Sequence, residues 1–338
     1  MVIKERDKRI AGKVKGMIEV PEVQYVICNE LLAGVGLDAV EVAAYLSDYL
    51  GRDIRVELAP HILGKNIREI TAAERRAMYE HAKANGTEYD ALHWLLAGGK
   101  DVFGDFEPWL TSPNAGQRIQ TANYFREEQR LLYDIRGGKP KGVMIVGSPK
   151  QRNIPEGMNH QQAELFAYNT VSRALEGTDN LDVVLAMEML TRKETDFCIT
   201  PQRVMALVQR VNHPRFLAMV DYKAYQGSGI RPAVGIANMP AKYLRRIHAN
   251  DPSLHLPGFS DNGYGAEDVL DPEFEMKELL RKYVEEGLDP AQCRVSLEGF
   301  KLPEGFDPRE AYKLSLDYLI AAEGKARTVL MEELTRQS

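Results

Sequence analysis

The sequence has little cysteine and no long apolar run, and each shortage excludes a class of protein. Its three cysteines, Cys28, Cys198 and Cys293, are an odd number without a close pair. This spacing offers neither a disulfide framework nor a thiolate metal motif. No apolar run reaches the roughly 18 residues that a membrane-spanning helix needs, and the charged segment 1–16 lacks the apolar core of a signal peptide. We therefore expect a soluble protein of the reducing cytoplasm, without a membrane partner.

Positive charge is not in excess either. The chain has 43 Lys and Arg against 49 Asp and Glu, a net charge of −6, which argues against a nucleic-acid partner. A DNA-repair endonuclease with several zinc ions would need a basic surface and more histidines than the seven scattered here. No GxGxxG follows the first predicted strand, which disfavours a dinucleotide-binding domain. A small-molecule substrate is the favoured partner.

Short apolar segments alternate with amphipathic ones along nearly the whole chain. We predict eight strands, at 23–32, 54–62, 89–98, 142–148, 181–189, 216–222, 244–250 and 293–300. Predicted helices cover 38–51, 71–86, 115–136 and 158–176, lie near 237–244 and 272–286, and begin at Thr200-Pro201 and Asp307-Pro308. This alternation favours a parallel sheet with right-handed crossovers. Eight units in about 320 residues predict a single-domain α/β protein, a (β/α)8 TIM barrel. An open, doubly wound sheet is the alternative.

The predicted domain covers residues 1–338, with the barrel core at about 18–325. Residues that cap helices support the predicted helix starts. Thr71 and Glu74 are spaced as a capping box, and Asp307-Pro308 with Glu310 repeats that spacing with proline at the first helical position. The segment 249–271 is predicted to form a long loop near the barrel mouth.

Four consecutive predicted strands end in residue types that bind metal ions. Glu188 ends the fifth strand, Asp221 the sixth, His248 the seventh and Glu298 the eighth. In a TIM barrel the carboxyl ends of the strands surround one mouth, where the chemistry takes place. Taken singly, each has an ordinary alternative, such as an ion pair for Glu188 or a core position for His248. Four at equivalent strand ends predict one divalent cation, with Mn²⁺ favoured and Mg²⁺, Co²⁺, Fe²⁺ or Zn²⁺ as alternatives.

Further polar residues follow strands at the same mouth and are predicted to bind substrate. His93 and Trp94 end the third strand, where an imidazole suits a sugar hydroxyl and an indole suits the apolar face of a sugar ring. Packing of Trp94 in the core is the alternative. Lys150, Gln151 and Arg152 follow the fourth strand. They could bind a carboxylate, a phosphate or hydroxyl groups of a substrate. The alternative is that they form a charged, solvent-exposed segment without a ligand.

The remaining candidates surround these groups. Lys223, two residues after Asp221, is a candidate catalytic residue that would stabilise an enolate oxygen, or donate a proton if its pKa were lowered. Asp251 and His255 follow the seventh strand and complete the predicted substrate-binding residues. Glu57 ends the second strand and is predicted to support the site from behind, whereas Trp109 is predicted to close over the mouth.

Six stretches carry a resemblance to a known family: ALHWLLAGG (91–99), VGSPKQRNI (146–154), AMEMLTRKETDF (186–197), MVDYKAY (219–225), IHANDPSLHLPGF (247–259) and VSLEGF (295–300). With them the whole barrel resembles the sugar phosphate isomerase/epimerase superfamily, the xylose isomerase-like barrels. The resemblance implies a metal bound by Glu188, Asp221, His248 and Glu298. It further implies that the two glutamates are the acid/base pair that moves a proton next to a carbonyl, through a metal-stabilised enediolate.

The chain departs from the ketose epimerases of that superfamily at two positions. They carry a histidine where this sequence has Ala224, and an arginine where it has Leu254, next to His255. The favoured function is therefore a metal-dependent sugar isomerase or epimerase. The alternative is a lyase or dehydratase that performs β-elimination on a keto-sugar or inosose. A non-catalytic barrel is disfavoured because Glu188 and Glu298 are both present.

The resemblance also bears on assembly. Barrels of this class often form dimers or tetramers, so a homo-oligomer is expected, and a hetero-subunit partner is an alternative. The expected ligand is a small-molecule carbohydrate, and its phosphorylation state is left open.

Overall fold

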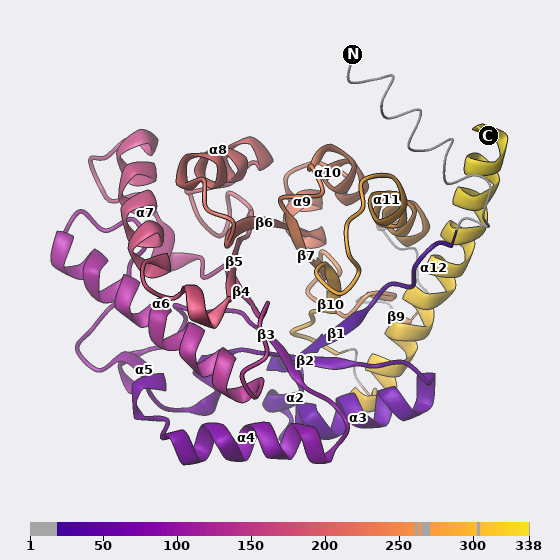
Figure 1. Cartoon of the computed structure of the whole chain (residues 1–338), viewed down its shortest axis with the longest axis horizontal. Helices are drawn as coiled ribbons and strands as arrows, with labels where there is room; N and C mark the ends of the chain where they lie inside the picture. The colour runs from indigo at the N-terminus through magenta and orange to yellow at the C-terminus, as the bar shows by residue number, and fades with distance from the viewer. Residues whose placement is uncertain (1–18, 261–262, 265–270, 303–304, 338) are drawn as a thin grey trace.

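Eight strands pair in parallel and close into a barrel in the computed structural model, which describes residues 19–260, 263–264, 271–302 and 305–337. The strand order around the barrel is β1-β10-β7-β6-β5-β4-β3-β2 (Figure 1). The barrel strands are β1 (Tyr25–Cys28), β2 (Arg55–Leu58), β3 (Tyr89–Leu92), β4 (Val143–Val146), β5 (Val184–Met187), β6 (Phe216–Asp221), β7 (Leu244–Ala249) and β10 (Arg294–Leu297). Each lies within its predicted segment. The predicted TIM barrel is therefore confirmed, and the closed sheet excludes the doubly wound alternative.

Helices pack around the outside of the barrel, as Figure 1 shows. They are α2 (Glu30–Gly34), α3 (Ala39–Leu50), α4 (Ala72–Ala84), α5 (Lys100–Phe103), α6 (Ala115–Ile135), α7 (His160–Leu175), α8 (Pro201–Val211), α9 (Tyr222–Gly227), α10 (Pro232–Asn238), α11 (Pro272–Glu285) and α12 (Pro308–Gln337). Short 3-10 helices are η1 (Pro60–Leu63), η2 (Ile67–Glu69), η3 (Lys150–Arg152) and η4 (Asp179–Leu181), and β8 (Phe259–Ser260) pairs with β9 (Gly263–Tyr264). Within the described residues, no helix is both long enough and apolar enough to cross a bilayer.

The structure shows the whole predicted capping box at Thr71 and the N-cap half of the one at Asp307. Thr71 and Glu74 form both hydrogen bonds of a capping box at the start of α4. Asp307 accepts hydrogen bonds from the backbone of Arg309 and Glu310 at the start of α12. Residues 1–18, and 261–262 and 265–270 of the predicted loop at 249–271, lie outside the described residues.

The helix predicted near 237–244 is wrong. Two shorter helices, α9 and α10, connect β6 to β7, and α10 ends at Asn238. Met239 is extended, with φ −82° and ψ 120°. The cause is Pro240, because a proline disfavours the helical conformation of the residue before it. Pro232 at the first turn of α10 pre-sets the backbone there instead.

The barrel interior has an apolar half and a charged half. Ala91, Val143, Ile145, Ala186 and Met219 form a small buried cluster of their own, from β3 to β6. The charged half involves β2, β3, β7 and β10. Its contacts include Glu57 with Arg246, and β2 and β7 are separated by β1 and β10 around the barrel. These side chains therefore meet across the interior, below the carboxyl ends of the strands.

A buried carboxyl group on α6 yields a stability prediction. Glu128 is fully buried, and among the described residues neither of its oxygens has a hydrogen-bond partner. Burial raises its pKa well above the usual value. In the unfolded chain the group ionises above its ordinary pKa of about 4.3, so keeping it protonated costs stability as the pH rises, by up to about 1.4 kcal/mol per pH unit. Glu128→Met is expected to stabilise the protein by about 1–3 kcal/mol at neutral pH, measured by urea unfolding.

The control is Glu127→Met, the same change at the neighbouring, half-buried position. The gain from Glu128→Met should shrink between pH 7 and pH 5, because the free energy needed to keep the folded group protonated falls as the pH approaches the unfolded pKa. An unchanged or lower unfolding midpoint for Glu128→Met would contradict the prediction.

Candidate metal centre

The four predicted metal ligands converge at the carboxyl ends of β5, β6, β7 and β10. His248 Nδ1 lies 3.6 Å from Glu188 Oε1, 3.9 Å from Asp221 Oδ2 and 3.5 Å from Glu298 Oε2. One ligand atom each from Glu188, Asp221 and His248 lies within 4.8 Å of the others. All four side chains are buried. Parallel pairing produces this arrangement, since Asp221 is in register with His248 and the ends of all these strands point the same way.

The imidazole of His248 is oriented from below. Its Nε2 lies 2.8 Å from Glu57 Oε1, a fully buried carboxylate at the end of β2. A histidine that donates from one ring nitrogen to a carboxylate presents the lone pair of the other nitrogen to a metal. Here Nδ1 faces the three carboxylates and makes no hydrogen bond within the described residues. Glu57 thus takes the supporting position that its place at a strand end predicts.

The three carboxylates repel one another in a buried site. Burial and the charges of Asp221 and Glu298 raise the pKa of Glu188 well above its usual value, and burial and Glu298 raise the pKa of Asp221 to about 6. Burial would also raise the pKa of Glu298, but His248, His93 and Lys223 lower it to about 2. A divalent cation offsets this repulsion, and a set of three carboxylates and one imidazole suits it. The residues fit a single cation.

A proton competes with such a cation for His248. Burial alone would lower the pKa of His248, but the carboxylates of Glu298 and Glu57 raise it well above the usual value. Metal ligation requires the neutral imidazole, so a cation must displace a proton at this nitrogen.

Asn250 is a residue of the site that the sequence reasoning missed. Its Nδ2 donates to Asp221 Oδ2 and to Glu298 Oε2, both at 2.7 Å. Its Oδ1 accepts a hydrogen bond from the backbone N–H of Lys223 at 2.8 Å. The fully buried amide therefore holds two of the candidate ligands and the start of α9 together. Its position directly after β7, between His248 and Asp251, was the available signal.

His93 and Trp94 lie near the centre but make contacts of their own. His93 is buried, with Nε2 against the Glu30 carboxylate and Nδ1 3.4 Å from Glu57 Oε1. Both ring nitrogens thus face carboxylates, and its ring is 6.0 Å from that of His248. Trp94 has a left-handed backbone with φ of 52°, and its ring packs edge-on against Phe300 at 5.9 Å. Their sugar-binding roles stay predictions.

Lys150, Gln151 and Arg152 form η3, separated from the end of β4 by three residues, and differ in exposure. Lys150 is exposed and Gln151 is half-buried. Arg152 is buried, and its Nη1 donates to the backbone oxygens of Val146 at 3.2 Å and Glu188 at 2.7 Å. Arg152 therefore ties the ends of β4 and β5 together beside a candidate ligand. Its Nη2 makes no hydrogen bond to the described residues.

Lys223 pairs with a carboxylate outside the metal set. Its Nζ lies 2.6 Å from Glu194 Oε1. Burial alone would lower the pKa of Lys223, but Asp221 and Glu194 raise it above the usual value. In the absence of a cation the ammonium form is thus favoured, which suits electrostatic stabilisation better than proton donation.

Asp251 and His255 are buried in one turn after β7. The Asp251 carboxylate accepts hydrogen bonds from the backbone N–H of Ser253 at 2.7 Å and from its hydroxyl. The same hydroxyl lies 2.8 Å from His255 Nδ1. The turn is thus held by its own polar groups.

Trp109, the predicted lid residue, donates from Nε1 to the Asn153 carbonyl at 3.0 Å, which ties its loop to the segment after η3.

Comparisons with known proteins agree with this architecture. A family model described as "Xylose isomerase-like TIM barrel" matches residues 30–320. A search of curated proteins found no match to the chain. Many solved structures are similar to the chain, and three of them illustrate the likeness. D-psicose 3-epimerase of Clostridium cellulolyticum H10, in complex with D-tagatose, has a TM-score of 0.64 at 15% identity, over 91% of this chain and 99% of that one.

The second structure is the 3-keto-D-glucoside 4-epimerase YcjR of E. coli, with a TM-score of 0.65 at 14% identity, over 89% of this chain and 100% of that one. The third is the IolI protein with a bound zinc atom, with a TM-score of 0.57 at 12% identity, over 92% of this chain and 99% of that one. At these identities the likeness shows the fold alone. The family model covers most of the barrel, from α2 into α12, and the chain belongs to the xylose isomerase-like TIM barrel family.

Proposed function

We propose that this protein is a divalent-metal-dependent isomerase or epimerase of a ketose or keto-sugar. The observation that carries the proposal is the convergence of Glu188, Asp221, Glu298 and His248 Nδ1 at the barrel mouth. A cation held there, Mn²⁺ foremost, would polarise the substrate carbonyl and offset the charge that develops on its oxygen. The structural neighbours include a D-psicose 3-epimerase and a 3-keto-D-glucoside 4-epimerase, so ketoses and keto-sugars are both proposed as substrate classes.

Glu188 and Glu298 are the proposed acid/base pair. They stand at the two ends of the strand series β5-β6-β7-β10, so they approach the centre from opposite sides of the arc. Their surroundings push their pKa values apart, upward for Glu188 and to about 2 for Glu298. These directions describe the site without metal, and a bound cation would favour the ionised form of both carboxylates. One glutamate removes the proton next to the carbonyl, and the other returns a proton to the opposite face.

The second candidate function is β-elimination from a keto-sugar. Positions 224 and 254 carry Ala224, which is buried, and Leu254, whose backbone lies in a left-handed turn with φ of 75°. Neither side chain offers a polar group to sugar hydroxyls, unlike the residues that the ketose epimerases carry there. Proton removal at the same carbon would then expel the substituent one carbon further on. Product mass separates the two, because isomerisation conserves it and elimination does not.

The experiment begins with the metal. We expect elemental analysis by inductively coupled plasma mass spectrometry to find about one Mn, Mg, Co, Fe or Zn per wild-type chain after incubation with Mn²⁺. His248→Ala should lose most of it, because the imidazole is a ligand. The control is His81→Ala, a part-exposed histidine at the end of α4 that pairs with Asp38. Equal metal content in all three proteins would show that His248 is not a ligand.

The metal-loaded protein is then incubated with ketoses and 3-keto-sugars in D₂O. Deuterium incorporation at the carbon next to the carbonyl supports proton abstraction, and product mass distinguishes isomerisation from elimination. A wild-type protein that binds no divalent metal would overturn the proposed function.

A further inference from the structure

A line of alternating charges extends from the candidate metal centre down through the barrel interior. Below His248, Glu57 Oε1 accepts its Nε2–H at 2.8 Å. Glu57 Oε2 lies 3.6 Å from Arg246 Nε, and Arg246 Nη2 contacts the Asp90 carboxylate. The side chains of His248, Glu57, Arg246 and Asp90 are each at most 1% exposed. The line is thus continuous and excluded from water.

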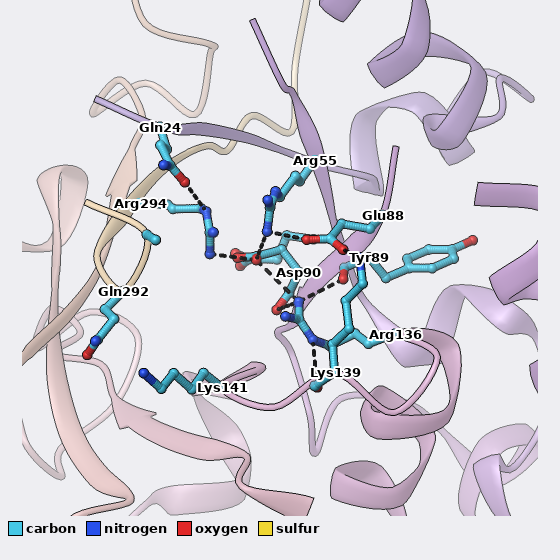
Figure 2. A network of polar contacts seen from close by, with 12 residues as sticks. Gln24, Arg55, Glu88, Tyr89, Asp90, Arg136, Lys139, Lys141, Gln292 and Arg294 are labelled. Atoms are coloured by element: carbon cyan, nitrogen blue, oxygen red, sulfur yellow. Dashed lines mark hydrogen bonds and ion pairs between the residues drawn. The ribbon is translucent and has the colours of Figure 1, made fainter. Parts of the chain in front are cut away.

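Asp90 anchors the lower end of this line. Its Oδ1 lies 2.7 Å from Arg294 Nη1, 3.3 Å from Arg136 Nη1 and 3.5 Å from Arg55 Nη1, a network that Figure 2 shows. Arg136 also donates to the Tyr89 carbonyl at 2.9 Å. A register shift between β2 and β3 pairs Val56 with Tyr89 but Glu57 with Ala91, which leaves Asp90 as the extra residue of a bulge. A bulge re-aims a side chain, and here the carboxylate reaches Arg246 on β7.

Stability alone is a poor explanation for this line. Barrel interiors are usually filled by branched apolar side chains, and the half formed by β3 to β6 is apolar too. A buried ion pair is often no more stable than apolar residues of the same size. The charged half, by contrast, lies directly below a candidate metal ligand. A role in orienting that ligand accounts for the position of the charges.

We propose that Arg246, anchored by Asp90, is a positioning residue that fixes Glu57 and thereby aims His248 Nδ1 at the three carboxylates. The inference rests on the proposed metal centre. Glu57 Oε2 is held by Arg246 and by the Ser296 hydroxyl at 2.7 Å. Glu57 Oε1 lies between two imidazoles, His248 at 2.8 Å and His93 at 3.4 Å. Without Arg246 the Glu57 carboxylate loses the guanidinium beside Oε2, and only the Ser296 hydroxyl then opposes its rotation toward His93.

The test compares two buried arginines. Arg246→Met removes the charge and keeps the aliphatic length. Arg215→Met makes the same change at a buried arginine that binds Gln129, Thr178 and Asp179 away from the line. Binding of Mn²⁺ to the full chain is measured by isothermal titration. Loss of a residue that supports a metal ligand typically weakens metal binding by about 10–100-fold, so we expect that loss for Arg246→Met and a change within about twofold for Arg215→Met.

Two further readouts separate positioning from general damage. The visible spectrum of the Co²⁺-loaded protein reports ligand geometry, and it should differ from wild type for Arg246→Met at saturating Co²⁺ but not for Arg215→Met. Arg246→Lys keeps the positive charge but lacks the planar guanidinium group that reaches both the Glu57 and the Asp90 carboxylates. Arg246→Lys should therefore bind Mn²⁺ more tightly than Arg246→Met but several-fold more weakly than wild type. If Arg246→Met does not fold, Arg246→Lys takes its place in the test.

Each remaining outcome counts against the inference. Wild-type Mn²⁺ affinity in Arg246→Met, or in Arg246→Lys where only that variant folds, overturns the positioning role and leaves the proposed function standing. An equal loss in Arg215→Met assigns the effect to general destabilisation and also overturns it. A wild-type protein without Mn²⁺ binding removes the proposed function, and the inference with it.

Discussion

Replacing Glu188 with glutamine is expected to lower turnover by at least about 10²-fold while the barrel stays folded. Removing one essential acid or base group costs about that much, and glutamine keeps the shape of the side chain without its proton transfer. Burial and the neighbouring carboxylates raise the pKa of Glu188, so replacing it with a neutral side chain should not destabilise the barrel. The same loss is expected for Glu298→Gln, because one carboxylate removes the proton and the other returns it. Turnover is measured as deuterium exchange next to the substrate carbonyl.

The control is Glu156→Gln, an exposed carboxylate on the segment between η3 and α7. It should retain full turnover. Circular dichroism and thermal unfolding confirm that all three variants are folded. Near-normal turnover in Glu188→Gln or Glu298→Gln would end the acid/base assignment for that residue.

The second large effect is expected at Gly147, directly after β4. A Cβ added there would lie 1.9 Å from Glu188 Oε2 and 3.1 Å from Glu188 Cδ. The atoms in the way are the tip of a flexible side chain, so the collision is relieved when the Glu188 carboxylate moves. Gly147→Ala should therefore fold normally but displace a candidate ligand. A misplacement of about 1 Å can cost 10²-fold in rate, and we expect turnover to fall by about that factor, together with weaker Mn²⁺ binding.

Gly324→Ala provides the matched control. It makes the same change within α12, where the added Cβ meets no atom within 4 Å among the described residues. Alanine is favoured over glycine in a helix by about 1 kcal/mol, so this variant should be slightly more stable and fully active. Full activity and unchanged Mn²⁺ affinity in Gly147→Ala would show that the Glu188 carboxylate is not held against this glycine in the working enzyme.

The strands and the candidate ligands were predictable from the sequence for one reason. Apolar runs such as that ending in Glu188 are local patterns, and eight of them alternating with helices leave few arrangements. In a parallel barrel all strands end at the same mouth, so a residue at a strand end is placed without knowledge of any contact. Glu188, Asp221, His248 and Glu298 needed no more than this. The helix predicted near 237–244 does not form there because Pro240 disfavours the helical conformation of Met239.

The sequence by itself thus determined the barrel and which four residues meet at its mouth. Only the tertiary structure decided what surrounds them. Asn250 bridges two ligands, and Gly147 leaves room for Glu188. Asp90 reaches Arg246, 156 residues away along the chain, because a bulge turns its side chain inward. These contacts depend on strand register and on distances across the barrel interior, which vary with a shift of one residue and leave no periodic trace in the sequence.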